Sequence, residues 1–290
     1  MDFVEIAVID IDGEAAEAVS ELFNRYGYGG AVIEALAPNF DQVTVRTVLP
    51  SEDDAGLRHL EVMLALIGQA LPHGLPEPRL QFVGESDWAE SWKEHFHVVR
   101  VGQRFVVKPS WRDYSLVEGD ILIEIDPGLA FGSGLHPTTQ LCLTLFEELS
   151  WQGQSLFDVG AGSGILSIAA AKLGAGPVRA VDIDPIVVDI ARENFERNGL
   201  AGQIETAIGS AHAAGRRRWD IVIANILAHI LIDIMPGLVA ALAPDGQLIL
   251  SGIIAEQEAG VTSAAAAQGL DIIDRRIVED WVALVARRGS

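Results

Sequence analysis

The spacing of apolar residues in the first part of the chain predicts a small domain of strands and helices. Strand-like apolar runs alternate with segments in which apolar residues recur every three or four positions, the period of a helix. We expect Gly27, Gly29 and Gly30 to separate the first helix from the next strand. The predicted order is strand Phe3–Ile9, helix Glu14–Tyr26, strands Ala31–Leu36 and Gln42–Leu49, helix Asp53–Ala70 and strand Leu80–Val83. This β-α-β-β-α-β order predicts a ferredoxin-like α+β domain over residues 1–84.

After Asp126 the pattern changes to a regular alternation of apolar strands and amphipathic helices. Such an alternation is typical of an α/β fold with a parallel, doubly wound sheet, which we place at residues 101–290. The expected strands are Ser155–Val159, Val178–Ile183, 204–208, 220–224 and 247–253, the expected helices are Ile165–Leu173, Ile186–Asn198 and 229–242, and residues 271–288 should form two final strands.

Between these two domains lies an aromatic segment, DWAESWKEHFHVVRV. Trp88, Trp92 and Phe96 are four residues apart, so a helix would bring them to one face. Such a stripe indicates core packing or a hinge between domains rather than a cofactor site. We therefore predict a linker with a helix over residues 85–100, followed by short strands within 98–125.

Composition and charge restrict the classes of partner. The formal net charge is −21, and a surface this acidic repels phosphate backbones, so no direct sequence-specific nucleic-acid partner is expected. The charge favours a basic partner, or it serves only to keep the protein soluble. The apolar segment Ile221–Leu242 is interrupted by Asn225, His229, Asp233 and Pro236, which argues against a membrane span. The single cysteine, Cys142, and the lack of a signal peptide predict a cytoplasmic protein.

A glycine-rich stretch, DVGAGSG, follows the first predicted strand of the larger domain. Glycines at 160, 162 and 164 allow a sharp turn and let the backbone approach a ligand closely, and the following helix start offers free amide groups. Asp182, eighteen residues after Gly164, ends the next strand and is suited to accept hydrogen bonds from ribose hydroxyls. Asp184 is an alternative for this role.

The glycine spacing excludes one common class of nucleotide site. The dinucleotide fingerprint requires G-x-G-x-x-G, and its third glycine would fall at position 165, which is isoleucine. A nicotinamide oxidoreductase is therefore disfavoured. An acid before G-x-G-x-G, here Asp158, together with a later acid at a strand end, resembles the S-adenosylmethionine loop of Rossmann-like methyltransferases.

Asn225 ends the apolar strand in WDIVIANILAH. Asparagine is unfavourable inside strands, so it should lie at the carboxyl edge of the sheet, where ligands bind in open α/β folds. In amino-group methyltransferases, asparagine or aspartate at this position orients the amine. The Pro-Pro-Tyr that often follows is replaced by Ile226-Leu227-Ala228. A polar residue that only ends the strand is the alternative interpretation.

A second glycine-containing stretch, FGSGLHPTTQ, lies just upstream at 131–140. His136 precedes Pro137, a residue suited to the first turn of a helix, so His136 either shapes this turn or accepts a proton. Cys142 should lie inside the helix and serve packing.

Together, FGSGLHPTT, DVGAGSGIL, VDIDP and NILA resemble the ribosomal protein L11 methyltransferase (PrmA) family over most of the chain. The resemblance implies a Rossmann-like, seven-stranded methyltransferase domain preceded by a small domain that recognises the ribosomal protein. It departs from the family pattern at Ser133 and Ala161, which are more often threonine and cysteine. Cofactor contacts are implied for Thr139, Gly160, Asp182 and Asn225, and we add Asp158, Gly162 and Phe131.

The implied reaction is methylation of lysine ε-amino and N-terminal α-amino groups on ribosomal protein L11, free or on the ribosome, with S-adenosylmethionine as cofactor. Asn225 would position the amine, without a metal ion. We expect a monomer. The alternatives are a methyltransferase for another protein, RNA or a small-molecule amine, and a non-catalytic module that only binds the cofactor.

Overall fold

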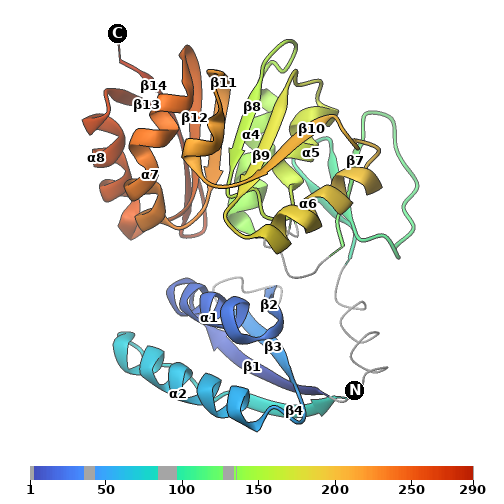
Figure 1. Cartoon of the computed structure of the whole chain (residues 1–290), viewed down its shortest axis with the longest axis vertical. Coiled ribbons are helices and arrows are strands. Elements are labelled where there is room, and N and C mark those ends of the chain that lie inside the picture. Colours follow the sequence, from blue (N-terminus) through green and yellow to red (C-terminus); the bar gives the residue numbers. More distant parts are fainter. Residues whose placement is uncertain (1–2, 36–42, 84–96, 127–133, 135, 290) are drawn as a thin grey trace. The chain divides into compact units, whose positions relative to one another are not determined.

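The computed structural model describes residues 3–35, 43–83, 97–126, 134 and 136–289. The chain divides into two compact units, residues 1–96 and 97–290, each with its own core (Figure 1). Residues 85–96 of the predicted linker and helix, with Trp88, Trp92 and Phe96, lie outside the described residues, and residues 97–100 are not helical, because a strand begins at Val99.

The first unit has the predicted β-α-β-β-α-β order. Its four strands form one antiparallel sheet in the order β2-β3-β1-β4, the arrangement of a ferredoxin-like domain. Asp12 and Asp53 cap the two helices by accepting hydrogen bonds from backbone amides. The elements are β1 Phe3–Ile11, α1 Gly13–Tyr26, β2 Tyr28–Ala35, β3 Val43–Pro50, α2 Asp54–Ala70 and β4 Arg79–Val83.

One prediction about this unit was wrong. Gly29 and Gly30 do not separate the helix from the strand, because β2 already begins at Tyr28 and includes both glycines. The pairing of β2 with β3 shifts register between Tyr28 and Val32. Glycines inside a strand often mark such an irregularity, which explains why they did not end the strand.

The second unit begins with a small mixed sheet. Strands β5 Val99–Val101, β6 Phe105–Lys108 and β7 Ile121–Glu124 lie in sequence order, with β6 and β7 parallel. The carboxylate of Glu147 accepts hydrogen bonds from the backbone amides of Gln103 and Arg104, which attaches the β5–β6 turn to helix α4, Pro137–Glu148.

The large sheet has seven strands, the number that the family resemblance implies, and their order is β10-β9-β8-β11-β12-β14-β13. The first five are parallel, and β14 is antiparallel to both of its neighbours. The strands are β8 Leu156–Val159, β9 Val178–Asp182, β10 Ile204–Ile208, β11 Trp219–Asn225, β12 Leu242–Ile254, β13 Leu270–Val278 and β14 Trp281–Arg288. The remaining helices are α5 Ile165–Lys172, α6 Pro185–Arg197, α7 Ala228–Ala241 and α8 Glu258–Ala267, with short 3-10 turns at Ala211–Ala214 and Ala255–Gln257.

Helices cover both faces of this sheet. Ile221 and Ile223 of β11 join the core cluster that includes α4, α5 and α6, whereas Val222 and Ala224 join the cluster that includes α7 and α8. A strand buried on both faces is continuously apolar, which is why β11 was recognisable in the sequence. Helix α8 was not predicted, and β12 begins earlier than expected.

Candidate active site

Three parallel strands, β8, β9 and β11, lie side by side and end at the same edge of the sheet. Val159 is paired with Val181 and with Ala224, so the next residue along each segment lies at this edge: Gly160 after β8, and Asp182 and Asn225 as the last residues of β9 and β11. Ligands bind at this edge in open α/β sheets. The structure therefore brings the three predicted groups together.

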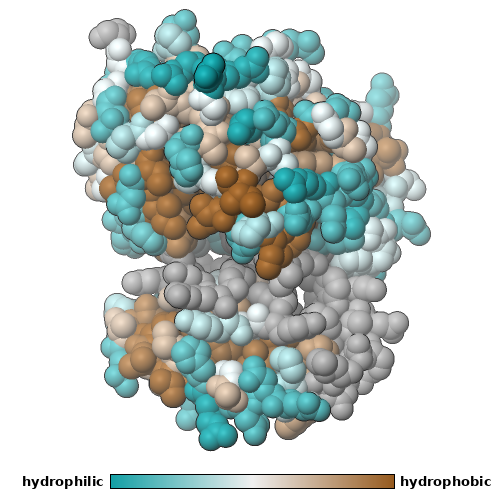
Figure 2. Space-filling model, viewed as in Figure 1, coloured by the Kyte–Doolittle hydropathy of each residue, from teal (hydrophilic) through white to brown (hydrophobic). Residues whose placement is uncertain are grey.

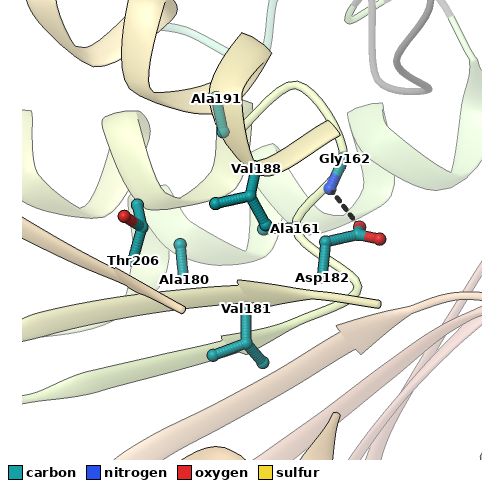
Figure 3. A pocket seen from close by; sticks show the side chains of 8 residues that line it. All are labelled: Ala161, Gly162, Ala180, Val181, Asp182, Val188, Ala191 and Thr206. Atoms are coloured by element: carbon teal, nitrogen blue, oxygen red, sulfur yellow. Dashed lines mark hydrogen bonds between the residues drawn. The ribbon is translucent and has the colours of Figure 1, made fainter. Parts of the chain in front are cut away.

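The loop after β8 is held in a fixed shape by backbone hydrogen bonds. The amides of Gly160 and Ala161 both donate to the carbonyl of Val181, at 2.9 and 3.0 Å. The amide of Gly162 donates to Oδ2 of Asp182 at 3.1 Å (Figure 3). Gly160, Gly162 and Gly164 all have positive φ angles, of +73°, +55° and +80°, which only glycine adopts readily.

Two of these glycines are also required by close packing. A Cβ at Gly160 would clash with Cγ2 of Ile226, and a Cβ at Gly164 would clash with the ring of Phe195. From the sequence, these glycines were expected to allow a sharp turn and close approach of a ligand. Their packing partners lie on distant segments, β11–α7 and α6, so the sequence carried no signal for this second role.

Asp158 lies beneath the loop rather than at its surface. Its side chain is 1% exposed, and one carboxylate oxygen accepts a hydrogen bond of 2.7 Å from Oγ of Ser167. Burial, together with the nearby charge of Asp182, raises the pKa of Asp158 to about 7. In the structure, Asp158 supports the helix start behind the loop.

The two candidate acids after β9 have different roles. The carboxylate of Asp182 accepts hydrogen bonds from the amides of Gly162 and Asp184. The carboxylate of Asp184 instead caps helix α6 by accepting a hydrogen bond of 2.8 Å from the amide of Ile186. The geometry thus favours Asp182 over Asp184 as the acid that faces the cofactor.

Apolar residues surround Asp182 at the sheet edge. A shallow hollow is lined by Ala161, Gly162, Ala180, Val181, Asp182, Val188, Ala191 and Thr206 (Figure 3). Ile183 follows Asp182 in the sequence and is 74% exposed, and Ile208 pairs with Asp182 across the sheet and is 61% exposed. Hydrophobic residues appear in patches on the displayed surface of this unit (Figure 2). Neither isoleucine was singled out from the sequence, because their exposure is visible only in the structure.

Asn225 combines burial with an unused hydrogen-bond acceptor. Its Nδ2 lies 3.5 Å from Oγ1 of Thr139, whereas its Oδ1 is buried and has no hydrogen-bond partner among the described residues. Buried polar atoms are nearly always paired, so an unpaired oxygen at a sheet edge indicates a ligand-binding group. The turn after Asn225 is fixed by a hydrogen bond of 3.1 Å from the amide of Ile226 to the carbonyl of Ser251.

The described part of FGSGLHPTTQ supports this arrangement from α4. His136 caps α4: its Nδ1 lies 3.3 Å from the amide of Thr138, and its ring packs edge-on against Trp281. Burial lowers the pKa of His136 to about 4, so the ring is neutral at pH 7. Thr139 is fully buried, and its Oγ1 lies within reach of Nδ2 of Asn225. The predicted contact of Phe131 lies outside the described residues.

Cys142 lies inside α4, fully buried, and burial raises its pKa to about 12. The packing role is therefore favoured for this thiol. Among the described residues, no group of three or more His, Cys, Asp or Glu side chains could hold a metal ion. No helix in the described ranges is long and apolar enough to cross a membrane.

Comparison with known proteins identifies the family. The sequence model of the ribosomal protein L11 methyltransferase (PrmA) family matches residues 2–289. The chain belongs to the ribosomal protein L11 methyltransferase family. It is 42% identical to the ribosomal protein L11 methyltransferase of Pelotomaculum thermopropionicum, over 99% of both chains. It is also 42% identical to that of Chloroflexus aurantiacus, over 99% of this chain and 98% of the relative.

A solved structure supports the same assignment. The crystal structure of a ribosomal protein L11 methylase from Lactobacillus delbrueckii subsp. bulgaricus is 38% identical and matches with a TM-score of 0.64. The match covers 67% of this chain and all of that chain. The fold class and the enzyme class predicted from the sequence, a Rossmann-like methyltransferase, are thereby confirmed. Membership in this class implies S-adenosylmethionine as the methyl donor.

Proposed function

We propose that the protein methylates lysine ε-amino groups and the N-terminal α-amino group of ribosomal protein L11, with Asn225 as the residue that positions the amine. The family and the names of its relatives support the substrate. The observation that carries the role of Asn225 is its buried Oδ1, which has no partner among the described residues.

The residues at the sheet edge fit S-adenosylmethionine. The glycine loop has no side chains that would block close approach of a ligand, and Asp182 presents a carboxylate at the end of β9. We assign the ribose hydroxyls to Asp182, the methionine part to Gly160 and Gly162, and the flanks of the adenine ring to Ile183 and Ile208. When bound, S-adenosylmethionine supplies an activated methyl group for direct transfer to a nitrogen.

The protein's task in this reaction is to hold a neutral amine in line with the donor. A lysine side chain has an ordinary pKa of about 10.4, so only about one in a thousand is neutral near pH 7.4. Burial at the edge of the sheet favours the neutral amine. The Oδ1 of Asn225 then accepts a hydrogen bond from that amine and leaves its lone pair free to react. Catalysis is positioning and desolvation.

Residues 1–96 have their own sheet and core, and we propose that this unit recognises the ribosomal protein. Residues 97–290 contain all the described site groups, and they also have their own core. Residues 97–290 alone should therefore bind S-adenosylmethionine as the full chain does but lose transfer to the ribosomal protein. Equal transfer by both forms would contradict this division of roles.

The substrate assignment can be tested directly. Purified protein should transfer labelled methyl groups to ribosomal protein L11, and mass spectrometry should place them on lysines and on the N-terminal amine. RNA and small amines, offered separately, should remain unlabelled, since the charge of −21 disfavours RNA. Labelling of RNA or of an unrelated protein instead would contradict the proposal.

We also propose that the enzyme acts in the cytoplasm as a monomer.

A further inference from the structure

The last turn of helix α6 contacts two segments that are far apart in the sequence. The contacts are made by three polar side chains, Asn194 and Arg197 of the helix and Asn198, its C-cap residue. One segment is the glycine loop at the cofactor edge. The other is the segment Glu124–Asp126, at and just after the end of strand β7. None of these residues belongs to the site motifs found in the sequence.

Contact with the glycine loop is made through Asn194. Its side chain is 1% exposed, and Nδ2 donates a hydrogen bond of 2.9 Å to the carbonyl of Ser163. The neighbouring Phe195 lies against Gly164, at a position where a Cβ would clash with its ring. The end of the loop is therefore fixed to α6 by one buried hydrogen bond and one close packing contact.

Contact with the β7 segment is made through the other two side chains. Asn198 pairs with the backbone of Glu124 in both directions, accepting from its amide at 3.0 Å and donating to its carbonyl at 2.7 Å. Nη2 of Arg197 lies 3.2 Å from Oδ2 of Asp126. Asp126 also accepts hydrogen bonds from the amide and the hydroxyl of Ser110, at 2.6 and 2.9 Å.

Arg197 joins these two sets of contacts. Its Nη1 donates a hydrogen bond of 2.8 Å to Oδ1 of Asn194, so the amide of Asn194 is used on both sides. A continuous chain of polar contacts thus runs from the Ser163 carbonyl through Asn194 and Arg197 to Asp126. In the sequence, Asp126 lies five residues before Phe131, where FGSGLHPTT begins.

We propose that Asn194, Arg197 and Asp126 are positioning residues that hold the glycine loop in its cofactor-binding shape. The proposal rests on the proposed function, because it takes the loop as the site of S-adenosylmethionine. These contacts connect the loop to the end of β7, so a change at Arg197 removes one of the two hydrogen bonds that fix the side-chain amide of Asn194. The end of the loop at Ser163 is then less firmly held, whereas its backbone hydrogen bonds to β9 remain, and the cofactor must order this end when it binds.

The expected effect follows from the size of such contacts. The Arg197–Asp126 pair is partly exposed, with side chains 30% and 25% accessible, so its contribution is modest. Arg197→Ala should raise the dissociation constant of S-adenosylmethionine by roughly 3- to 10-fold. Arg197→Lys keeps the charge but loses the forked geometry that reaches two partners, so it should have an intermediate effect.

Calorimetry with S-adenosylmethionine alone, on the full-length protein, tests the proposal. Asp126→Asn should weaken binding, and the double variant with Arg197→Ala should bind no more weakly than the worse single variant, because both break one chain. The matched control is Arg275→Ala, which removes two hydrogen bonds to Glu258. This pair is not part of the contacts between Ser163 and Asp126, so the dissociation constant of S-adenosylmethionine should be unchanged. Thermal denaturation of each variant separates lost stability from lost affinity.

The outcomes distinguish this proposal from the proposed function. If the unaltered protein fails to bind S-adenosylmethionine, the proposed function fails. If it binds, but Arg197→Ala and Asp126→Asn bind within about twofold of it, the positioning role is overturned. Equal weakening in Arg275→Ala would also overturn it, because the effect would then follow general stability. At saturating cofactor, kcat should recover in the Arg197 variant.

Discussion

The active-site edge has two halves that differ in how their polar groups are satisfied. In the cofactor half, made of loop Gly160–Gly164 and Asp182, backbone amides and the carboxylate are hydrogen-bonded to one another. In the other half, at the end of β11, which we call the amine half, the Oδ1 of Asn225 is buried with no partner among the described residues. The cofactor half is pre-formed, whereas the amine half keeps an unpaired acceptor, which we propose serves the amine.

This difference fits the two tasks of a methyltransferase site, which are to bind the cofactor and to position the amine. A pre-formed cofactor half lowers the cost of ordering the loop when the cofactor binds. An unpaired buried acceptor costs stability, and such a cost is expected where the group serves a ligand. The two halves should therefore respond differently to substitution: the cofactor half in affinity, and the amine half in rate.

The largest effect is expected for Asp182→Ala. Loss of the carboxylate should raise the dissociation constant of S-adenosylmethionine by about 1,000-fold, because two charge-assisted hydrogen bonds to the ribose contribute roughly 2 kcal/mol each. Calorimetry measures this constant. The matched control is Asp184→Ala, which should cost about 1 kcal/mol of stability through loss of the α6 cap and leave affinity unchanged. The reverse result would move the ribose contact to Asp184.

An intermediate effect is expected for Asp158→Asn, and it should depend on pH. The pKa of Asp158 is raised to about 7 in the folded state, so this state holds a proton that the unfolded chain releases near pH 4. This group's contribution to the free energy of unfolding therefore falls as pH rises from about 4 to about 7. An asparagine at this position cannot ionise, so the variant lacks this loss. Between pH 5 and pH 8 its free energy of unfolding should therefore rise by roughly 2–3 kcal/mol relative to that of the unaltered protein.

Urea denaturation of both proteins at several pH values measures this difference. The difference should grow up to about pH 7 and stay constant above it, because Asp158 is then ionised in both the folded and the unfolded protein. A difference independent of pH would show that Asp158 is ionised in the folded protein throughout. Asp158 would then join Asp182 as a charged group of the cofactor half.

The smallest effect is expected for His136→Ala. The substitution removes the cap of α4 and the edge contact with Trp281, which should lower stability by roughly 1 kcal/mol. With a pKa of about 4, His136 does not titrate near neutral pH, so the pH profile of transfer between pH 6 and pH 8 should keep its shape. A lost inflection in that profile would instead make His136 the proton acceptor of the amine half.

Much of this account was predictable because it depends on local patterns. Strands β8, β9 and β11 are mostly apolar, and the polar residues that end β9 and β11, Asp182 and Asn225, were therefore expected at the sheet edge. Glycine spacing identified the loop and excluded a dinucleotide site. FGSGLHPTT and NILA pointed to the family.

What the sequence could not reveal depends on contacts between distant segments. Helix α8 is mostly alanine in its second half, so it has helix propensity but little apolar periodicity. Asn194 is one polar residue among many in α6, and nothing in the sequence places it beside Ser163. The cap formed by Asp184 and the packing of Ile226 on Gly160 became visible only in three dimensions.

The most direct test of the central claim is a split between rate and affinity at Asn225. In single-turnover reactions with ribosomal protein L11, Asn225→Ala should lower the rate of transfer by about 100-fold, the size of effect seen when a positioned hydrogen-bonding group is removed. Asn225→Asp retains an oxygen acceptor and should lose less. Both variants should bind S-adenosylmethionine within about tenfold of the unaltered protein. A normal transfer rate in Asn225→Ala, or a loss confined to cofactor affinity, would contradict the assignment of the amine to Asn225.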